Sequence, residues 1–479
     1  MVTMEKQLQS AARTLRGDLE SHIAGHVLVM GDPDYNEKRK AYNLSVDQHP
    51  DVIVEVADAH DIVQALRFAE EYGMGVAVQA TGHGVKRPAD GAMLILTSAM
   101  QGVKIDPEAG TARVEAGVRW GAVLEKAQAF GLAPLLGSST SVGAVGYTLG
   151  GGFGWLGRKY GLSTDSVHSF EFVTPADELL HVSRDENRDL FWALRGGGGS
   201  LGIVASMEIQ LYPVTTVYAG NLFYPVGQAR EVFGRYREWI AGVPDELTSS
   251  VSIAHFPPFP SVPEPLRGQA FAVVRGCYVG PEAEGEALLR FWRAWRRPQV
   301  DLFGPMSFRD AASISSDPPD PVPFYNSGAW LRDLADDAVE ALVSHGAPAA
   351  GDPPFVHTEV RHAGGVIARV DPESTAYSHR TETLLLNLIA TTPTPEAYAH
   401  ATASVEALMQ DLAPSLSGGV YPNFLSGAMA RARIADAYTS DAYLQLRAIK
   451  AIVDPANRLG YSFNIEPLLD TACEEPDID

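Results

Sequence analysis

The sequence predicts a fold of mixed helices and strands with more than one domain. The chain has 479 residues, more than a single hydrophobic core usually serves, so two or three domains are expected. Runs rich in β-branched residues, typical of strands, alternate with helical patterns. Near residue 213 glycine becomes rarer and proline clusters appear, which indicates a domain boundary. The predicted segments are residues 1–212, 213–420 and 421–479.

The first region has a β-α-β pattern that leads into a distinctive loop. A helical pattern from Met4 to Gly31 comes first, and a strand is predicted over Asp51–Val56. A helix over Asp61–Tyr72, apolar on one face, and a strand over Val76–Gln79 follow. The second strand runs into Thr81-Gly82-His83-Gly84. Because ligand sites of α/β units gather beyond the carboxyl ends of strands, we expect this loop to bind a ligand.

The same criteria predict the later elements. We expect strands over residues 93–96, 103–105, 111–116, 201–212, 270–278 and 355–361, and helices over residues 120–130, 189–195 and 442–453. On the strand at 355–361, the two-residue period puts His357, Glu359 and Arg361 on one face. That polar face either points at a substrate or is a solvent-exposed edge with a cross-strand ion pair.

Composition and charge exclude several kinds of partner. Hydrophobic residues make up 46% of the chain and charged residues 20%, as in ordinary globular proteins. The formal net charge of −22 disfavours nucleic acid and anionic membranes, because both bind basic surfaces. With no long apolar run and no secretion signal, we expect a soluble cytoplasmic protein. Cys277 and Cys473 are too few for a disulfide scaffold or a cysteine metal site, and no metal is expected.

Glycine is concentrated between Gly137 and Gly161, among several serines. Because glycine lets backbone N–H groups approach a diphosphate closely, one hypothesis is phosphate binding, and the other is tight turns alone. The pattern G-x-G-x-x-G begins twice, at Gly152 and at Gly197. The second match follows a predicted helix and precedes a predicted strand, which reverses the order of a Rossmann unit. We therefore reject a nicotinamide-binding domain.

A set of motifs in a fixed order indicates a family resemblance. The motifs are Gly82-His83, Val114-Glu115-Ala116-Gly117, the segments 142–154 and 158–165, Asp189-Leu190-Phe191-Trp192 with the glycines that follow, and Asp454-Pro455-Ala456-Asn457. Together they resemble the FAD-linked oxidases of the berberine bridge enzyme-like group, in the class of vanillyl-alcohol oxidase and para-cresol methylhydroxylase. The resemblance is strongest from about Val52 to Pro213 and returns near the C-terminus.

This resemblance implies an α+β fold with a two-part FAD-binding domain, an antiparallel-sheet substrate domain covering the flavin, and a C-terminal return to the FAD-binding domain. In the family, the histidine that matches His83 is bonded to the 8α-methyl group of the flavin, so covalent FAD is expected. Doubly linked members carry a cysteine where this chain has Ser139, which leaves one bond. The residues that resemble the cofactor site are Thr81, Gly82, His83, Gly84, Ser138, Ser139, Ser141, Val142, Gly143, Gly146, Gly152, Gly154, Gly202, Ile203, Val204 and Asn464.

Catalysis requires a group that removes the hydroxyl or amine proton of the substrate, and in this family tyrosine often supplies it. The family pattern Tyr-x-Asn-Tyr is Tyr421-Pro422-Asn423-Phe424 in this chain, so one phenol is kept and one is replaced. The candidates are Tyr421, Tyr147, Tyr438 and Glu359. Each tyrosine is alternatively a packing aromatic.

The expected activity is that of an FAD-dependent oxidase. It takes two electrons from an alcohol, amine or phenolic carbon of a small, natural-product-like substrate in specialised metabolism, and passes them to O2. Four aromatic residues in proline-bounded loops, Phe256, Phe259, Phe324 and Tyr325, either suit an apolar substrate or anchor those loops. The alternatives are a dehydrogenase or oxidative cyclase of the same fold, or a noncatalytic flavin or small-molecule binding protein. The oligomeric state is left open.

Overall fold

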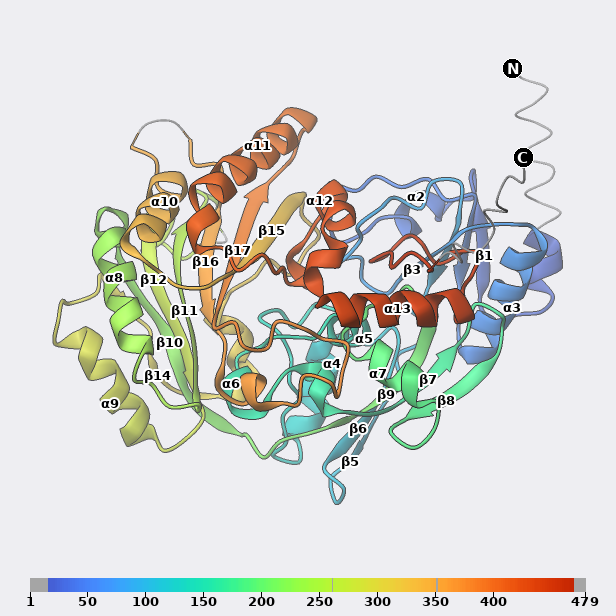
Figure 1. The fold of residues 1–479 in the computed structure, drawn as a ribbon, viewed down its shortest axis with the longest axis horizontal. Helices are drawn as coiled ribbons and strands as arrows, with labels where there is room; N and C mark the ends of the chain where they lie inside the picture. The colour runs from blue at the N-terminus through green and yellow to red at the C-terminus, as the bar shows by residue number, and fades with distance from the viewer. Residues whose placement is uncertain (1–15, 261, 350–351, 469–479) are drawn as a thin grey trace, which may run out of the picture.

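Three β-sheets organise the protein, whose computed structural model describes residues 16–260, 262–349 and 352–468. A four-stranded and a five-stranded sheet come from the N-terminal region, and an eight-stranded sheet comes from the middle of the chain. In Figure 1 the eight-stranded sheet lies on the left and the two smaller sheets lie on the right. The α+β fold predicted from the sequence is confirmed.

The four-stranded sheet contains the predicted β-α-β unit. Its order is β1 (His26–Val29), β2 (Val52–Glu55), β4 (Met93–Leu96) and β3 (Val76–Gln79), with β2 and β3 parallel to β4. Helix α3 (Ala59–Glu71) connects β2 to β3, and the Asp58 carboxylate caps it by accepting a hydrogen bond from Asp61 N. Ile62 and Leu66 on its buried face join the core of this sheet. The carboxyl end of β3 therefore opens at a fixed place beside β4.

The predicted helical pattern from Met4 to Gly31 is wrong at its C-terminal end. Residues 26–29 form β1, which pairs antiparallel with β2, and Val27 lies opposite Val54. Pairing with an existing strand supplies the backbone hydrogen bonds of this short segment, and that tertiary contact outweighs its helical periodicity. Helix is present at residues 16–20, and the part before residue 16 lies outside the described residues.

The five-stranded sheet is antiparallel throughout. Its order is β5 (Val103–Asp106), β6 (Thr111–Glu115), β9 (Ile203–Gln210), β7 (Val167–Val173) and β8 (Leu179–Ser183). Four helices connect these strands, namely α4 (Trp120–Gln128), α5 (Ala144–Leu149), α6 (Gly157–Tyr160) and α7 (Arg188–Leu194). The glycine run at Gly197 lies between α7 and β9, in the helix-to-strand order that argued against a Rossmann unit.

The eight-stranded sheet is also antiparallel. Its order is β13 (Val300–Asp301), β10 (Thr216–Pro225), β12 (Ala270–Tyr278), β11 (Leu247–His255), β16 (His357–His362), β17 (Leu384–Thr391) and β15 (Phe324–Leu331), with β14 (Gly304–Ser307) paired to β10. Four helices cover its outer face in Figure 1, namely α8 (Ala229–Ile240), α9 (Glu282–Arg293), α10 (Asp336–Gly346) and α11 (Pro395–Asp411). Alternate strand residues such as Val251, Val360 and Leu386 pack into that helical layer, so the residues between them face the two smaller sheets.

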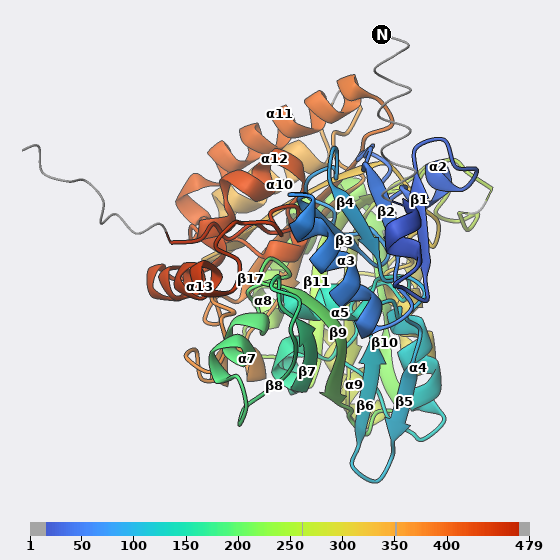
Figure 2. The same ribbon diagram turned by 90° about the vertical axis from the view of Figure 1, so that its right-hand side faces the viewer.

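The C-terminal segment returns to the N-terminal region. Helix α12 (Gly427–Ala432) and helix α13 (Ser440–Val453) follow the last strand, and Leu446 of α13 packs in the same core as Leu194 of α7. Figure 2 shows α13 on the same side of the molecule as α7. A short helix, α2, spans Tyr35–Lys38, and 3-10 helices span Ser163–Ser166, Val226–Gln228, Phe308–Ile314, Gly365–Arg369, Ala413–Ser415, Pro422–Phe424 and Ile434–Ala437. Among the described residues, every helix is too short or too polar to span a lipid bilayer.

Candidate active site

The Thr81–Gly84 loop lies directly beyond the carboxyl end of β3. Gly82 has a φ of +78°, and a Cβ there would stand 2.6 Å from the Ala41 Cα atom. Only glycine fits both the backbone conformation and this close approach. The turn brings His83 under Tyr42, whose ring stacks on the imidazole with the centroids 3.6 Å apart. The loop thus holds one imidazole ring in a fixed orientation.

Both ring nitrogens of His83 have hydroxyl partners. Nδ1 lies 2.8 Å from Thr81 Oγ1, and Nε2 lies 3.2 Å from Ser141 Oγ. Burial, followed by the positive charge of Arg119, lowers the pKa of His83 to about 3. The imidazole is therefore neutral near pH 7, and one of its nitrogens carries a lone pair available to form a bond.

The serine-glycine segment packs against the histidine loop. Ser139 Oγ lies 2.8 Å from Ser141 Oγ, which in turn contacts His83. A Cβ on Gly143 would stand 3.4 Å from Ala80 Cβ, so the two backbones approach closely. The two predicted cofactor segments, around residue 81 and around residues 139–143, are therefore side by side although they lie far apart in the sequence.

The other predicted cofactor residues lie around these loops. Gly84 follows His83, Ser138 and Val142 flank the serines, Gly146 is in α5, Gly152 and Gly154 lie between α5 and α6, Gly202 precedes Ile203 and Val204 at the start of β9, and Asn464 is near the C-terminus. A Cβ on Gly84 or Gly146 would meet no atom within 4 Å among the described residues, so space is open beside both. A Cβ on Gly202 would instead overlap the Phe172 ring, which gives that glycine a packing role.

The phenol oxygen of Tyr421 is surrounded by hydrogen-bond donors. Its Oη accepts hydrogen bonds from Gly152 N at 3.1 Å, Phe153 N at 3.0 Å and Asn423 Nδ2 at 3.1 Å. Burial raises the pKa of Tyr421 above its ordinary value, and these three bonds and the charge of Arg361 offset only part of that rise. Three donors directed at one oxygen stabilise negative charge on it, as an oxyanion hole does.

Tyr147 and Tyr438 have different surroundings. The Tyr147 hydroxyl is buried without a partner among the described residues, and the raised pKa of Tyr147 comes from burial first and then from Tyr421. Tyr147 also feels the charge of Arg361, so these three side chains lie near one another. Tyr438 donates instead to the Gly196 carbonyl at 3.2 Å and stacks on Tyr443. These are the contacts of a packing aromatic, and a catalytic role for Tyr438 stays a prediction.

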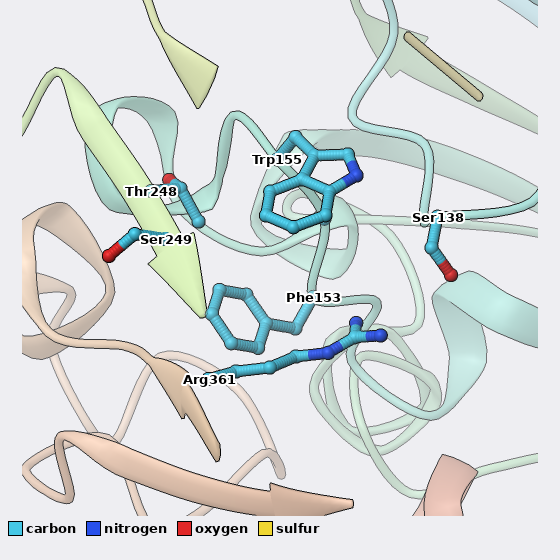
Figure 3. Close-up of a pocket in the computed structure, with 7 residues that line it drawn as sticks. Ser138, Phe153, Trp155, Thr248, Ser249 and Arg361 are labelled. Carbon is cyan, nitrogen blue, oxygen red and sulfur yellow. The ribbon is translucent and has the colours of Figure 1, made fainter. Parts of the chain in front are cut away.

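Glu359 lies on the face of the large sheet that points away from the helices. Its Oε2 accepts a hydrogen bond from Arg361 Nε at 2.7 Å, and its Oε1 lies 3.7 Å from Arg275 Nη1. Burial raises the pKa of Glu359, but the charges of Arg361 and Arg275, the His357 ring and the hydrogen bond from Arg361 together outweigh burial and hold the pKa far below its usual range. The carboxyl group is therefore ionised at physiological pH and has little basicity. Figure 3 shows Arg361 reaching from β16 toward Phe153 and the side where Ser138 lies, around a small cavity.

Known proteins share both the sequence pattern and the fold. A model of the FAD binding domain matches residues 50–183. An uncharacterized FAD-linked oxidoreductase of Bacillus subtilis is 27% identical over 94% of this chain and 98% of its own length. The (R)-6-hydroxynicotine oxidase of Paenarthrobacter nicotinovorans is 26% identical over 93% of this chain and 97% of its own. The solved structure of berberine bridge enzyme from Eschscholzia californica is 20% identical, covers 96% of this chain and 99% of its own, and has a TM-score of 0.78.

The chain is an FAD-linked oxidoreductase with an FAD binding domain, and its resemblance to the berberine bridge enzyme-like oxidases is confirmed.

The residues of this FAD-linked oxidoreductase fit the cofactor. Among the described residues, four buried polar atoms near the glycine turns have no hydrogen-bond partner, namely Tyr147 Oη, Ser200 Oγ, Ser462 Oγ and Asn464 Oδ1. Buried polar groups are normally paired, so these atoms indicate a polar ligand that reaches from α5 to the C-terminal segment. A Cβ on Gly199 would stand 4.0 Å from Ser462 Oγ, which joins the glycine run before β9 to that segment.

Several polar residues on the large sheet of the oxidoreductase were not predicted from the sequence. Asn221, Arg275 and Asn387 face the same way as Glu359, and each is at most 7% exposed. Their strands are otherwise apolar, so a charged or amide residue at an inward position was the available signal. Lys86, shortly after His83, was also missed: it donates to the Leu425 carbonyl, and burial lowers the pKa of Lys86 to about 7.

The expected aromatic loops of the oxidoreductase need a correction. Phe324 and Tyr325 belong to strand β15, and Tyr325 packs edge-on against Tyr398 of α11 in the helical layer. Phe256 packs against Phe223 and Phe271, whereas Phe259 is 60% exposed. Strand pairing with β17 fixes the alternation that turns Tyr325 away from the site. These four aromatics do not form one apolar substrate surface.

Proposed function

We propose that this oxidoreductase is an oxidase with FAD bonded to His83. It takes two electrons from an alcohol, amine or phenolic carbon of a small organic substrate and passes them to O2. The observation that carries the proposal is the neutral imidazole of His83, clamped between Thr81 and Ser141 beside the serine-glycine segment. The expected division of the chain supports it, with residues 1–212 and 421–479 proposed as the FAD-binding part and residues 213–420 as the substrate-binding part.

A single covalent bond is the form of attachment we propose. The neutral His83 ring offers a nucleophilic nitrogen, and its stack on Tyr42 limits the directions in which that nitrogen faces. A second bond through sulfur is excluded at Ser139, because a hydroxyl stands there in place of a thiol. The proposed contacts to the rest of the cofactor are the backbone around Gly143 and Gly146, the start of β9, and the side chains of Ser462 and Asn464.

Bound FAD supplies the two-electron acceptor, and the protein must manage the proton. We propose that Tyr421, once deprotonated, receives the hydroxyl or amine proton of the substrate, because the N–H donors around its oxygen stabilise the phenolate that burial disfavours. Arg361 adds a positive charge near both Tyr421 and Tyr147. Glu359 is held ionised by its arginines, so in this proposal it orients Arg361.

The reaction with oxygen distinguishes the oxidase from a dehydrogenase or an oxidative cyclase of the same fold. The name of the (R)-6-hydroxynicotine oxidase, similar along nearly its whole length, favours the oxidase. The test reduces the purified holoenzyme photochemically without air and then mixes it with air-saturated buffer in a stopped-flow instrument. An oxidase regains its flavin absorbance much faster than free flavin does. A rate no faster than that of free flavin would exclude O2 as the acceptor.

A further inference from the structure

The inward face of the large sheet carries a continuous polar row. Asn221 of β10 lies opposite Arg275 of β12, Arg275 lies opposite Ser250 of β11, and Ser250 lies opposite Arg361 of β16. In the next register position Ser252 lies opposite Glu359, which lies opposite Asn387. Since Val251 and Val360 between them pack into the helical layer, these polar side chains all face the cofactor loops.

Arg275 is the least satisfied member of this row. Its side chain is buried and makes no hydrogen bond among the described residues. Its Nε is wholly buried without a partner, and the nearest carboxylate oxygen, Glu359 Oε1, is 3.7 Å from Nη1. A guanidinium with five donors normally pairs in a forked, two-bond geometry when it is buried. The described residues therefore provide no hydrogen-bond partner for the guanidinium group of Arg275.

The charges in the row also indicate that Arg275 lacks a partner. Glu359 forms ion pairs with two arginines, and the shorter of the two joins it to Arg361. The other negative group that raises the pKa of Arg275 is Asp317, which lies on an exposed loop, and the neighbouring Arg361 lowers it. Burial keeps His357 neutral. One positive charge of the buried row is thus left without a buried negative partner, which is unfavourable in a low-dielectric site.

Neighbouring groups also lack partners. Among the described residues, the unpaired buried atoms around Arg275 are Asn221 Oδ1, Ser250 Oγ, Ser252 Oγ and Glu359 Oε1. The two serine hydroxyls can donate to an anion, whereas Glu359 Oε1 and Asn221 Oδ1 can accept from a hydroxyl or amine. The row therefore matches a ligand with one anionic group and at least one hydrogen-bond donor.

We propose that Arg275 is a specificity residue that binds a carboxylate of the substrate, so that this enzyme oxidises an organic acid bearing a hydroxyl or amine group. The inference rests on the proposed function, because it names the substrate class of that same site. Arg361 marks the end of the row near the cofactor loops, and Arg275 lies two strands farther along it. The acid group is held at Arg275, which leaves the oxidised carbon toward Tyr421 and Tyr147.

The test measures carboxylate binding to the holoenzyme by the change in flavin absorbance and by thermal unfolding. Benzoate and acetate are the probes, and benzamide and acetamide are their neutral controls. We expect the acids to bind and to raise the unfolding temperature of the wild type, with no such effect of the amides. Arg275→Met should weaken benzoate binding by about 10- to 100-fold, which corresponds to one charge-assisted pair. Arg230→Met, at an arginine of α8 on the opposite side of the sheet, should bind benzoate like the wild type.

The unfolding temperature distinguishes a role of Arg275 in substrate recognition from a role in stabilising the fold. Because Arg275→Met removes a buried charge without a side-chain hydrogen bond and leaves Glu359 paired with Arg361, its unfolding temperature without ligand should equal or exceed that of the wild type. Arg275→Lys keeps the charge but loses the fork, and should bind benzoate with an intermediate affinity. Equal binding of acid and amide, absence of acid binding in the wild type, or full benzoate affinity in Arg275→Met and Arg275→Lys would each overturn the assignment.

The same holoenzyme distinguishes this inference from the proposed function. Fast reoxidation by air without carboxylate binding would leave the oxidase standing and remove the acid substrate. Carboxylate binding lost in Arg275→Met, together with slow reoxidation, would keep Arg275 as an anion-binding residue and remove the oxidase. A panel of hydroxy acids and amino acids, each paired with its methyl ester, then identifies which reduce the flavin anaerobically. We expect the free acids to reduce it at least 10-fold faster at subsaturating concentration.

Discussion

At the residue scale, a few contacts place His83. Thr81 and Ser141 fix its ring by hydrogen bonds, Tyr42 fixes its plane, and Gly82 provides the turn that brings them together. The sequence alone indicated the loop and its position after a strand, because β-branched residues and a following glycine are local signals. The partners at Tyr42 and Ser141 come from distant segments, so no local pattern predicted them.

The left-handed turn at Gly82 is the first prediction. Gly82→Ala adds a methyl group against Ala41 in a backbone conformation that disfavours it, and we expect it to displace His83. The measured flavin-to-protein absorbance ratio of the purified variant should fall to less than about half of the wild-type value. Gly73→Ala, after the end of α3, is the matched control, since Gly73 has a similar φ of +63° and its methyl group would meet no described atom within 4 Å. Equal flavin loading in both variants would contradict the role given to this turn.

At the element scale, helix α13 fastens the C-terminal segment to the glycine turn before β9. Lys450 donates to the Ser200 carbonyl at 2.5 Å and pairs with Asp454 at 2.5 Å. Asp454 also accepts hydrogen bonds from Arg458 N and Leu459 N. This buried network holds the chain that leads to Ser462 and Asn464, so one helix end supports the proposed cofactor contacts.

Removal of Lys450 should therefore be costly. Lys450→Met leaves Asp454 buried and unpaired, and we expect the free energy of unfolding to fall by about 3–5 kcal/mol. Urea denaturation monitored by circular dichroism measures this change. Lys40→Met, at an exposed pair with Glu37, should change it by less than about 1 kcal/mol. A loss as small as that for Lys450→Met would show that the pair is dispensable.

The sequence predicted elements well where the local pattern was strong. Strands Val76–Gln79, Met93–Leu96 and Ala270–Tyr278 have the predicted bounds, because short β-branched or apolar runs bounded by turns leave few alternatives. Strand β1 was missed because its pairing with β2 decides its structure. The polar row on the large sheet was also missed at Asn221 and Arg275, since only the cross-strand register brings these residues beside Glu359.

At the scale of the whole molecule, the cofactor loops of the small sheets face the polar row of the large sheet. Buried histidines on both sides have lowered pKa values. Burial, with nearby arginines, lowers the pKa of His83, His357 and His362 to about 3. The FAD-linked fold and the resemblance were predictable from motifs, whereas the burial that sets these pKa values depends on how distant segments pack.

Acid should consequently unfold the protein early. Unfolded histidine titrates near pH 6.5, so below that pH the unfolded chain binds protons that the folded chain does not. Each of the three buried histidines then lowers the free energy of unfolding by up to about 1.4 kcal/mol per pH unit, down to pH about 3. Urea denaturation at pH 7, 6 and 5 measures the slope, and His362→Gln should make it shallower. A free energy that stays constant from pH 7 to pH 5 would contradict the assigned pKa values.

The most direct test of the central claim asks where the flavin goes when the protein is denatured. The purified holoenzyme is precipitated with acid and centrifuged, and the absorbance of the redissolved pellet is compared with that of the supernatant. A covalent bond through His83 predicts that the yellow colour stays with the protein, and that His83→Ala folds but releases its flavin or contains none. Colour in the supernatant of the wild type, or a pellet that stays yellow in His83→Ala, would contradict attachment at this histidine.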